Sequence, residues 1–524
     1  MNRIDSQIKY PIGVQSFSKI REGGFLYIDK TAILYRLLHT DGYYFLSRPR
    51  RFGKSLMLST IEAYYQGRRE LFKGLALDSL TDDWDPHPVL HLDLNAREYI
   101  DRDSVVAQLN LHLELWEARY DCAKPDRSPE ERFGNVIRNA CERTGKKVVI
   151  LIDEYDKPLL SAVNDEELAD SYRSLLKAFY GNLKSLDPYI ENAFITGVAR
   201  FSKVSIFSDL NNLRDISFED EFSNICGITP DELDSYFKVG ISQLAEKENL
   251  SEDDIHKQLR ANYDGYHFSK RSKDIYNPFS LMNVFAKMDM GSFWFDSATP
   301  TFLVDLIKEE KWLLRDLAPI EIEAKRLESA GLLGSDPIPV LYQSGYLTIK
   351  DYDPIFKTYT LDYPNEEVRE SFISYLVPFY IEKKESSGRF SVKKFVNALY
   401  SGNIDHFMKM LESMIAGVPY SEKGSAEAHF QNACYLLFTL MGQYVKIEDR
   451  TSDGRIDLSV ETSRFIYIFE FKINESAENA IEQIFQKKYW LKYQTHIKEI
   501  ILIGANFDTH TRRITSYLVE RPYF

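Results

Sequence analysis

The chain has 524 residues, of which 44% are hydrophobic and 27% are charged, and its formal net charge is −14. A chain of this length exceeds one hydrophobic core, so we expect roughly three to four packed domains. The acidic balance excludes a surface that is basic throughout, so any contact with nucleic acid has to come from a local basic patch.

The cysteines and the N-terminal segment bear on the compartment. The four cysteines lie far apart without a CxxC pair, which fits neither a zinc site nor a disulfide framework and suits a reducing cytoplasm. The first segment, MNRIDSQIKY, is polar and lacks the apolar core of a signal peptide. No apolar run approaches the roughly 20 residues that span a bilayer. We therefore expect a soluble, cytoplasmic protein with no membrane segment.

The first part of the chain alternates short apolar runs with helical patterns, which indicates a parallel α/β sheet with helices on both faces. The run KVVILI has no solvent-facing position beyond its lysine, which is typical of a strand buried on both faces. The expected strands are 43–46, 89–94, 147–152 and 192–198, and the expected helices are 54–66, 104–119, 129–143 and 165–186.

The middle of the chain is expected to be mainly helical from Thr229 to about Met288. Thr229 suits the N-cap of a helix, Pro230 its first position and Glu232 its third, which is the pattern of a capping box. Further on, helical patterns flank a predicted hairpin at 346–363, a layout whose size is compatible with a winged helix.

The last part of the chain follows a soft boundary at GVPYSEKGS, up to which helical patterns continue. Its pattern predicts helix, hairpin, helix and strand, the composition of a small α/β domain. The predicted elements are a helix at 426–441, a hairpin, a helix at 477–493 and a strand at 498–504.

A phosphate-binding motif lies where the first strand gives way to a helix, in LSRPRRFGKSL. Backbone N–H groups at a helix start cradle phosphate, a lysine there reaches the β- and γ-phosphates, and the following serine holds Mg²⁺. Arg48 takes the first glycine position of GxxxxGK[ST], so a plain surface helix start is the alternative. The residues expected to bind nucleotide here are Arg51, Phe52, Gly53, Lys54 and Ser55.

Two carboxylates, Asp153 and Glu154, follow the buried strand at 147–152. Ligands bind at this carboxyl edge in open α/β sheets. We expect Asp153 to bind Mg²⁺ and Glu154 to orient or activate the attacking water. The alternative is a solvated strand end, which the GKS motif upstream disfavours.

The strand at 192–198 refines this site. In one large subclass of P-loop folds the strand after Walker B lies in space between the Walker A and Walker B strands. A polar residue at its end then contacts the reacting water or the γ-phosphate, and Thr196 is the candidate here. Arg200 follows as a cationic sensor or a finger in cis, and a plain loop arginine is the alternative.

A second acidic constellation lies in a late hairpin with a polar turn at Thr462-Ser463. A turn centred there places Asp457 opposite Ile468 and diagonal to Glu470, with about 7–8 Å between the backbones. The strand period puts Asp457, Glu470 and Lys472 on one face. Two carboxylates can hold Mg²⁺, and the lysine can position or activate a nucleophile. A salt-bridged outer face of an amphipathic strand is the alternative.

The next helix adds Gln483, with Lys487 and Trp490 on the same helical face. Glu427, on the preceding helix, is a further candidate acid. A basic and aromatic run offers the best local patch for nucleic acid, with a solvated helix face as the alternative. Its members are Lys487, Lys488, Tyr489, Trp490, Lys492, Tyr493 and Lys498.

These segments resemble a bacterial and archaeal architecture that pairs an AAA-ATPase-like domain with a C-terminal domain of the PD-(D/E)XK nuclease superfamily. The glycine-to-arginine change in Walker A is usual in this family, and Ile456-Asp457 replaces the PD dipeptide while keeping the acid. The motifs that carry the resemblance span nearly the full chain in order: YPIGVQSFSKIREGGFLYIDKT, SRPRRFGKSL, VVILIDEYDKPL, FITGVARFSKVSIFSDLNNLRDIS, YDGYHF, YNPFSL, YPNEEV and GRIDL…FEFK…Q.

The resemblance implies a P-loop NTPase sheet and a C-terminal α/β domain of the restriction-endonuclease-like fold, and the helical pattern between them indicates a helical and winged-helix-like middle region. The resemblance also implies ATP and Mg²⁺ as cofactors. Lys54 and Ser55 would bind phosphate and Mg²⁺, Asp153 and Glu154 would be the Walker B pair, and Asp457, Glu470, Lys472 and Gln483 would form the nuclease site. The expected domains are 1–228 (ATPase), 229–300 (helical lid), 301–418 (helical and winged-helix-like) and 419–524 (nuclease-like).

Three hypotheses follow for the function. The first is an ATP-regulated nuclease that acts on DNA or RNA. The second is a nucleotide-dependent NTPase that binds or senses nucleic acid, with a nuclease-like domain that does not cut. The third is a structural scaffold, which requires both motifs to be accidental. The sequence leaves the oligomeric state open, including a homo-oligomer.

Overall fold

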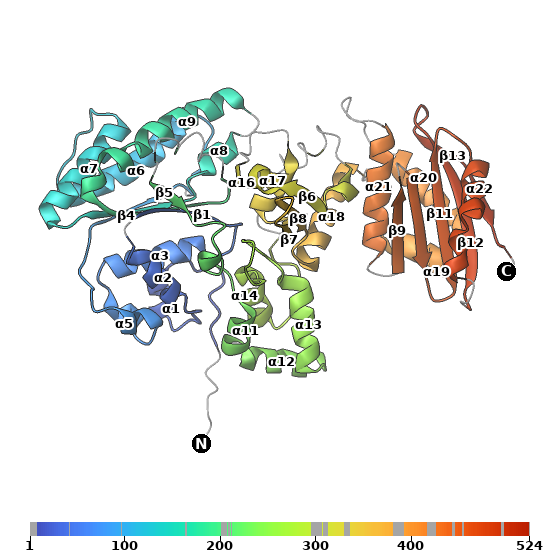
Figure 1. Ribbon diagram of the computed structural model, residues 1–524, viewed down its shortest axis with the longest axis horizontal. Coiled ribbons are helices and arrows are strands. Elements are labelled where there is room, and N and C mark those ends of the chain that lie inside the picture. The colour runs from blue at the N-terminus through green and yellow to red at the C-terminus, as the bar shows by residue number, and fades with distance from the viewer. Residues whose placement is uncertain are drawn as a thin grey trace, which may run out of the picture. The chain divides into compact units, whose positions relative to one another are not determined.

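The structure of the chain is a computed structural model (Figure 1). For residues 446–452, 455–457 and 492 only the backbone is described. The described ranges are 8–40, 42–95, 97–162, 165–200, 207, 210, 212–294, 307, 313–329, 336–380, 392–416, 426–442, 446–452, 455–493 and 497–522.

The chain forms two compact units. The first consists of Met1–Leu303 with Pro319–Arg369, and the second consists of Val304–Ala318 with Glu370–Phe524. Within the described ranges, no helix combines the length and apolarity needed to cross a bilayer. The finer division into four domains stays a prediction.

The core of the first unit is a five-stranded parallel sheet in the order β2-β3-β4-β1-β5. The prediction that the strand after Walker B lies between the other two is confirmed, because β4 pairs with β1 on one side and β3 on the other. All six residues of β3 are buried, as its apolar run predicted. The strands are β1 (Gly42–Ser47), β2 (Val89–Asp93), β3 (Val148–Asp153), β4 (Ile190–Gly197) and β5 (Leu213–Asp215).

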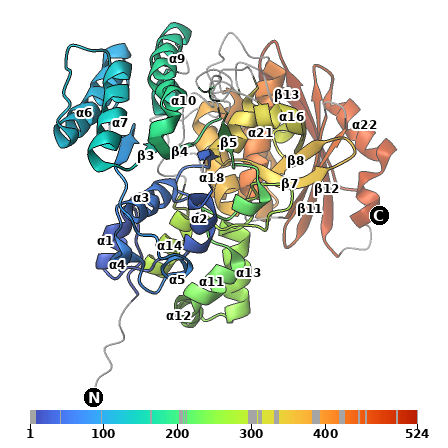
Figure 2. The ribbon, with the colours of Figure 1, turned by 60° about the vertical axis from the view of Figure 1, so that its left-hand side comes forward.

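Helices cover both faces of this sheet, as expected for a parallel α/β arrangement. Figures 1 and 2 show α6, α7 and α9 on one side and α1, α2 and α3 on the other. The first group includes α6 (Arg102–Tyr120), α7 (Pro129–Thr144), α8 (Lys157–Ser161), α9 (Glu166–Tyr180) and α10 (Asn182–Ser185). The second includes α1 (Phe17–Glu22), α2 (Thr31–Leu38), α3 (Lys54–Tyr65), α4 (Arg69–Phe72) and α5 (Ala76–Leu80).

The segment predicted to be a helical lid follows the sheet, and its predicted capping box is confirmed. Thr229 accepts from the backbone of Glu232, and the Glu232 carboxylate accepts from the backbone of Thr229 at 2.8 Å. The same carboxylate pairs with Lys30 at 2.6 Å, which ties the lid to the start of α2. The lid helices are α11 (Pro230–Tyr236), α12 (Lys238–Glu248), α13 (Glu252–Tyr263) and α14 (Pro278–Lys287).

The predicted hairpin is present and belongs to a three-stranded antiparallel sheet in the order β6-β8-β7. In the described part of the chain, two helices lie between the first strand and the hairpin; that this winged-helix-like segment is a true winged helix stays a prediction. The second of these helices, α17, is buried from Pro337 to Gln343. The elements are β6 (Ile320–Glu323), α16 (Ala324–Ser329), α17 (Pro337–Ser344), β7 (Thr348–Asp353) and β8 (Thr358–Asp362).

The second unit is built on a mixed sheet in the order β13-β12-β11-β10-β9, in which only β11 and β12 run parallel. Phe469 and Phe471 on β11 contact Phe438 and Phe430 of α21 on one face. On the opposite face Ile466 and other apolar residues pack against α22. The helices are α18 (Glu366–Tyr380, of which the second unit includes the part from Glu370), α19 (Val392–Tyr400), α20 (Ile404–Ala416), α21 (Ala426–Met441) and α22 (Ala477–Lys487). The strands are β9 (Lys446–Ser452), β10 (Arg455–Glu461), β11 (Phe465–Ile473), β12 (Glu499–Asp508) and β13 (Arg513–Glu520).

The predicted register of the late hairpin was wrong by two residues. Asp457 pairs directly with Glu470, whereas Ile468 lies opposite Ser459. The turn closes at the pair Glu461 and Ile466, so it is centred later in the chain than the polar dipeptide suggested. Directly opposed residues share a face, so the predicted common face of the two acids is retained and their backbones are closer than expected.

The predicted helix at 477–493 was also too long. The α-helix ends at Lys487, because Lys488 adopts a left-handed conformation with φ 52°. A short 3₁₀ segment, η5 (Tyr489–Tyr493), follows. The expected helical alignment of Gln483 with Trp490 therefore does not form.

Candidate functional site

The phosphate-binding loop connects β1 to α3. Gly53 has φ 95°, a conformation that glycine adopts without steric cost, and it forms the N-cap of α3. Lys54, the first residue of the helix, is 4% exposed. Its ammonium donates to the carbonyls of Arg48 at 3.0 Å and Pro49 at 3.3 Å. The loop thus folds over its own lysine.

Arg48, which replaces the first Walker A glycine, is almost fully buried. Its guanidinium donates to the carbonyls of Ser47 and Ser217, each at 2.9 Å, and of Phe222 at 3.3 Å. It also stacks 4.3 Å from the ring centroid of Phe268, in the YDGYHF motif. The arginine therefore anchors the loop to segments that a glycine would not contact.

The two predicted Walker B acids stand at the carboxyl end of β3. Oδ1 of Asp153 accepts hydrogen bonds from the Thr196 hydroxyl at 2.6 Å and from the Glu154 backbone at 3.1 Å. Oε1 of Glu154 lies 3.6 Å from Nζ of Lys54. Glu154 has φ 53°, and such strain, about 1–3 kcal/mol for a non-glycine residue, clusters at functional sites. The structure thus brings Lys54, Asp153, Glu154 and Thr196 together.

A third acid, Asp156, lies in the same IDEYD segment, but the sequence pattern did not identify it as a site residue. It is fully buried, and its Oδ2 accepts from the backbone of Val198 at 3.0 Å and of Ala199 at 2.6 Å. Burial, followed by the nearby charge of Glu154, raises the pKa of Asp156 to about 7. Asp156 thereby fixes the chain just beyond the end of β4.

A pocket of about 350 Å³ opens beside these residues. Its phosphate end is formed by Arg51, Gly53, Lys54, Ser55 and Glu154. Another part of the wall comes from residues 11–15, in the YPIGVQ segment, and from Phe279 in YNPFSL and the adjacent Met282, both on α14. This volume is within the range of about 300–1,000 Å³ for ligand sites, so a nucleotide fits the residues present.

Two residues of the predicted loop contact lid residues. The guanidinium of Arg51 lies 4.7 Å from the ring centroid of Phe279. The side chain of Phe52 does not line the pocket and is buried against Tyr266 and Phe268, at centroid distances of 4.7 and 5.3 Å. The Phe52 side chain packs the loop onto the lid, and the predicted contact of Phe52 with nucleotide stays a prediction.

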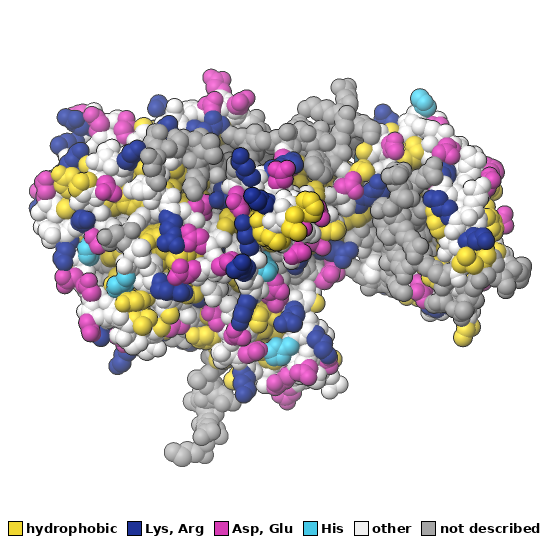
Figure 3. Space-filling model, viewed as in Figure 1, with side chains coloured by type: hydrophobic (Ala, Val, Ile, Leu, Met, Phe, Trp, Pro, Cys, Tyr) yellow, Lys and Arg dark blue, Asp and Glu magenta, His cyan; other side chains and the backbone are white. Residues whose placement is uncertain are grey.

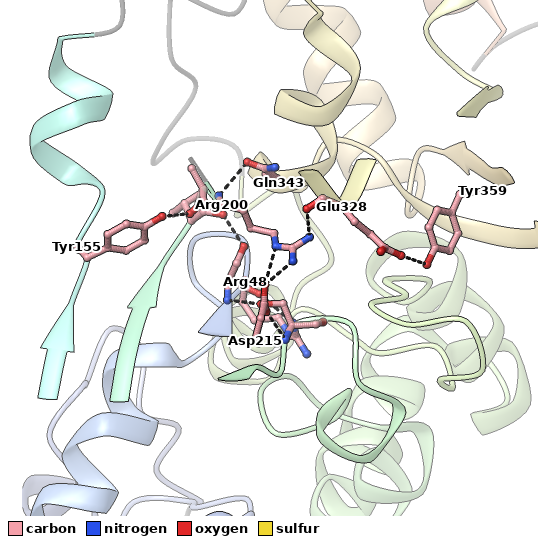
Figure 4. A network of polar contacts seen from close by, with 11 residues as sticks. Arg48, Tyr155, Arg200, Asp215, Glu328, Gln343 and Tyr359 are labelled. Atoms are coloured by element: carbon pink, nitrogen blue, oxygen red, sulfur yellow. Dashed lines mark hydrogen bonds and ion pairs between the residues drawn. The ribbon is translucent and has the colours of Figure 1, made fainter. Parts of the chain in front are cut away.

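Arg200 is held by a network of structural contacts, and its predicted role as a sensor or a finger in cis stays a prediction (Figure 4). Its guanidinium pairs with Asp215, donates to the carbonyl of Glu328 at 2.7 Å and stacks 4.5 Å from the ring of Phe218. Its backbone N–H donates to Gln343 at 3.1 Å. These partners lie far away in sequence, so no local pattern could have identified them.

The second constellation centres on Glu470 and Lys472 of β11 and Gln483 of α22. The Gln483 amide donates to Oε1 of Glu470 and accepts from Lys472 at 2.5 Å, and Lys472 lies 3.6 Å from Glu470. Oε2 of Glu470 is buried and has no hydrogen-bond partner in the described part of the chain. A divalent cation would satisfy this oxygen, so the residues present fit a metal. The side chain of Asp457 lies outside the described residues.

The other residues of the second unit that were predicted to bind metal or nucleic acid do not form one cluster with Glu470, Lys472 and Gln483 in the described part of the chain. Glu427 is exposed and accepts from Gln431 at 3.3 Å. Tyr489 and Trp490 pack against the core beside α22, and Lys498 pairs with Glu461 at 2.8 Å. Across the described side chains, no cluster of three His, Cys, Asp or Glu is arranged to hold a metal.

Charge on the first unit is mixed. On the face seen in Figure 3, acidic and basic side chains are interspersed over much of its surface. This agrees with the net charge of −14, which excludes a surface that is basic throughout.

Comparison with known proteins covers both constellations. Residues 11–207 match the family model described as a predicted AAA-ATPase, and residues 425–517 match that of the PD-(D/E)XK nuclease superfamily. The chain is also similar to an uncharacterized protein in the vnfD 5' region of Azotobacter chroococcum mcd 1. The two are 35% identical over 531 residues, which cover 98% of this chain and 99% of that protein.

Proposed function

Because the chain belongs to the family of predicted AAA-ATPases with a C-terminal domain of the PD-(D/E)XK nuclease superfamily, we propose that it hydrolyses ATP and couples hydrolysis to a Mg²⁺-dependent nuclease-like activity on DNA or RNA. The observation that carries the ATPase half is the 3.6 Å approach of Lys54 to Glu154. Both residues line the pocket of about 350 Å³.

Each residue of the first site has a role in this proposal. Lys54 and the backbone N–H groups at the start of α3 bind the phosphates, and Ser55 and Asp153 hold Mg²⁺. When bound, Mg²⁺ neutralises charge on the phosphate oxygens. Glu154 orients the attacking water and receives its proton. Thr196 keeps the Asp153 carboxylate oriented through its hydrogen bond of 2.6 Å.

The nuclease half is supported by the buried arrangement of Glu470, Lys472 and Gln483. Asp457, whose backbone pairs with Glu470, would complete the acidic set. The two acids would hold a divalent cation, which polarises the phosphodiester and lowers the pKa of a bound water. Lys472 would position the nucleophile, and Gln483 orients both Glu470 and Lys472.

The second candidate function is a nucleotide-dependent protein that binds nucleic acid without cutting it. The observation in its favour is that Oε1 of Glu470 already accepts from the Gln483 amide nitrogen, while Lys472 already donates to the Gln483 amide oxygen. The two functions differ in one outcome, cleavage in the presence of Mg²⁺ or Mn²⁺.

The ATPase half is tested by nucleotide titration and steady-state hydrolysis. Lys54→Ala should lose ATP affinity, whereas Glu154→Gln should bind ATP and lose at least about 100-fold in turnover. Lys146→Ala, which removes an exposed lysine paired with Asp85, is the matched control and should leave both properties unchanged. Unchanged affinity in Lys54→Ala would refute the phosphate-loop assignment.

The nuclease half is tested by incubating the full chain with single- and double-stranded DNA and RNA and Mg²⁺ or Mn²⁺. Asp457→Ala and Lys472→Ala should each abolish cleavage, and Lys409→Ala, an exposed lysine on α20, should not. Cleavage that survives in both site variants would exclude this site. Binding without cleavage by the wild type would establish the second candidate.

A further inference from the structure

A polar network joins the winged-helix-like segment to the edge of the parallel sheet. Arg200 lies at its centre, between Glu328 of α16 and Gln343 of α17 (Figure 4). The Arg200 guanidinium also pairs with Asp215 at the end of β5. One residue just beyond β4 thus contacts both helices of the segment and the edge strand β5.

From Asp215 the network continues into the phosphate-binding loop. Oδ1 of Asp215 accepts the backbone N–H of Ser217 at 2.9 Å. The Ser217 hydroxyl accepts the backbone N–H of Ser47 at 2.9 Å, and the Ser217 carbonyl accepts from Arg48 at 2.9 Å. Asp215 is therefore linked to the last residue of β1 and the first residue of the loop.

Arg48 extends the network to the phosphate-binding lysine. Its own carbonyl accepts from Lys54 at 3.0 Å. The turn after α17 approaches the same loop, because a Cβ placed on Gly345 would lie only 2.7 Å from Cβ of Pro49. Gly345 has φ 88°, so both its conformation and its surroundings favour glycine. The loop and the segment are therefore packed together as well as hydrogen-bonded.

The other end of the network reaches the Walker B acids. Thr196 binds Asp153 at 2.6 Å, and the backbone N–H groups of Val198 and Ala199 bind Asp156 at 3.0 and 2.6 Å. The short segment that starts at Thr196 ends at the central arginine of the network. A displacement of Asp153 or Asp156 would therefore be passed along a few bonds of backbone to α16 and α17.

The charged members of the network are buried. The side chains of Arg200 and Asp215 are 10% and 6% exposed, and Arg48 is 1% exposed. Burying such groups costs several kcal/mol per ion before pairing is counted, so stability alone is a weak reason to place them here. Buried polar groups that fix one arrangement between two elements are a better-attested use.

We propose that Arg48, Asp215 and Arg200 are positioning residues that couple ATP binding at Lys54 to the placement of α16 and α17. This proposal rests on the proposed ATP binding of the first unit. Coupling of this kind is reciprocal: ATP orders the winged-helix-like segment, and the segment in turn raises the affinity for ATP.

The test uses the full chain and a double-mutant cycle of Arg48→Lys and Arg200→Lys, which keep both charges and alter the hydrogen-bond geometry. ATP affinity is measured by titration, and the ordering of α16 and α17 by hydrogen–deuterium exchange with and without ATP. Arg214→Lys is the matched control, because this neighbour of Asp215 forms an exposed pair with Glu219.

In the wild type, ATP should slow exchange in α16 and α17. Each single variant should weaken ATP affinity about tenfold, and the loss of affinity in the double variant should be smaller than the product of the two single losses. In all three variants ATP should no longer protect α17 from exchange. Arg214→Lys should match the wild type. If the losses of ATP affinity multiply and ATP still protects α17 in the variants, the proposed coupling is overturned, whereas the proposed binding of ATP at Lys54 is not affected. A wild type that fails to bind ATP would overturn both proposals.

A second variant guards against loss of folding in the arginine variants. Gln343→Ala removes the acceptor for the Arg200 backbone N–H and leaves the pair with Asp215 in place. Gln343 is buried, so some loss of stability is expected, but the variant should stay folded at the assay temperature while ATP-dependent protection of α17 falls. Full protection in this folded variant would overturn the proposal.

Discussion

The hydroxyl of Thr196, at the end of β4, donates a hydrogen bond of 2.6 Å to Oδ1 of Asp153, at the end of the neighbouring strand β3. Both side chains are buried, Thr196 at 0% and Asp153 at 5% exposure. The bond fixes one carboxylate oxygen in a setting of low dielectric, where oriented hydrogen bonds are strongest. Asp153 is therefore preorganised before any ligand arrives.

Thr196→Val tests this preorganisation, because valine keeps the shape and removes the donor. We expect turnover of ATP to fall about tenfold with little change in KM, since a loosened Asp153 affects the reacting state more than binding. Steady-state kinetics measures both quantities. Thr439→Val, which removes a hydroxyl within α21, is the control. A rise in KM with unchanged turnover would contradict the role assigned to Thr196.

Arg48→Gly, which restores the Walker A consensus, should destabilise the protein. The change removes hydrogen bonds to the carbonyls of Ser47, Ser217 and Phe222 and leaves a cavity beside Phe268. We expect a loss of about 3–5 kcal/mol in the free energy of unfolding, measured by denaturant titration. Arg127→Gly, in an exposed turn, should cost less than about 1 kcal/mol. Equal losses in the two variants would show that Arg48 does not anchor the loop.

Asp156 should make stability depend on pH. Its pKa in the folded chain is raised to about 7 from an ordinary value of 3.8. A raised carboxyl pKa means that the folded state holds the proton more tightly, so this contribution is present below about pH 4 and is lost as pH rises through 7. Asp156→Asn should remove this component. The unfolding free energies of the variant and the wild type are compared from pH 4 to 8. As the pH rises, the variant should become more stable relative to the wild type. A pH-independent difference would contradict the raised pKa.

Divalent cations should stabilise the second unit through Glu470. Its buried Oε2 lacks a hydrogen-bond partner in the described part of the chain, so a bound cation would remove a desolvation penalty. Saturation at about 100 times the Kd adds about 2.7 kcal/mol of stability. Thermal unfolding with increasing Mg²⁺ or Mn²⁺ should show this rise in the wild type and not in Glu470→Gln. Glu482→Gln, on the exposed side of α22, should respond like the wild type.

The first site could be predicted because its residues follow strands of one parallel sheet. Carboxyl ends of such strands meet at one edge, so Lys54 and Glu154 come together once the strand order is inferred. The other part of the pocket wall could not be predicted. Residues 11–15 and Phe279 carry no local chemical signal, and only the packing of the lid places them there.

For the second site, the sequence predicted which residues share a face of the sheet, but it did not predict the strand register or the end of the following helix. The strand period correctly assigned Glu470 and Lys472 to one face, because the pleat alone determines this. The register depended on the position of the turn, which the polar dipeptide Thr462-Ser463 located too early. The end of α22 depended on a left-handed Lys488, a conformation that the residue type does not signal.

The burial of α17 has an evolutionary consequence. In a helix that reads DNA, outward side chains can change freely and so retarget the protein. Here Pro337 to Gln343 are held inside the first unit, and Gln343 also receives the backbone of Arg200. A substitution along this helix would disturb the fold before it altered any preference for a ligand, so new specificities have to arise on other surfaces of the molecule.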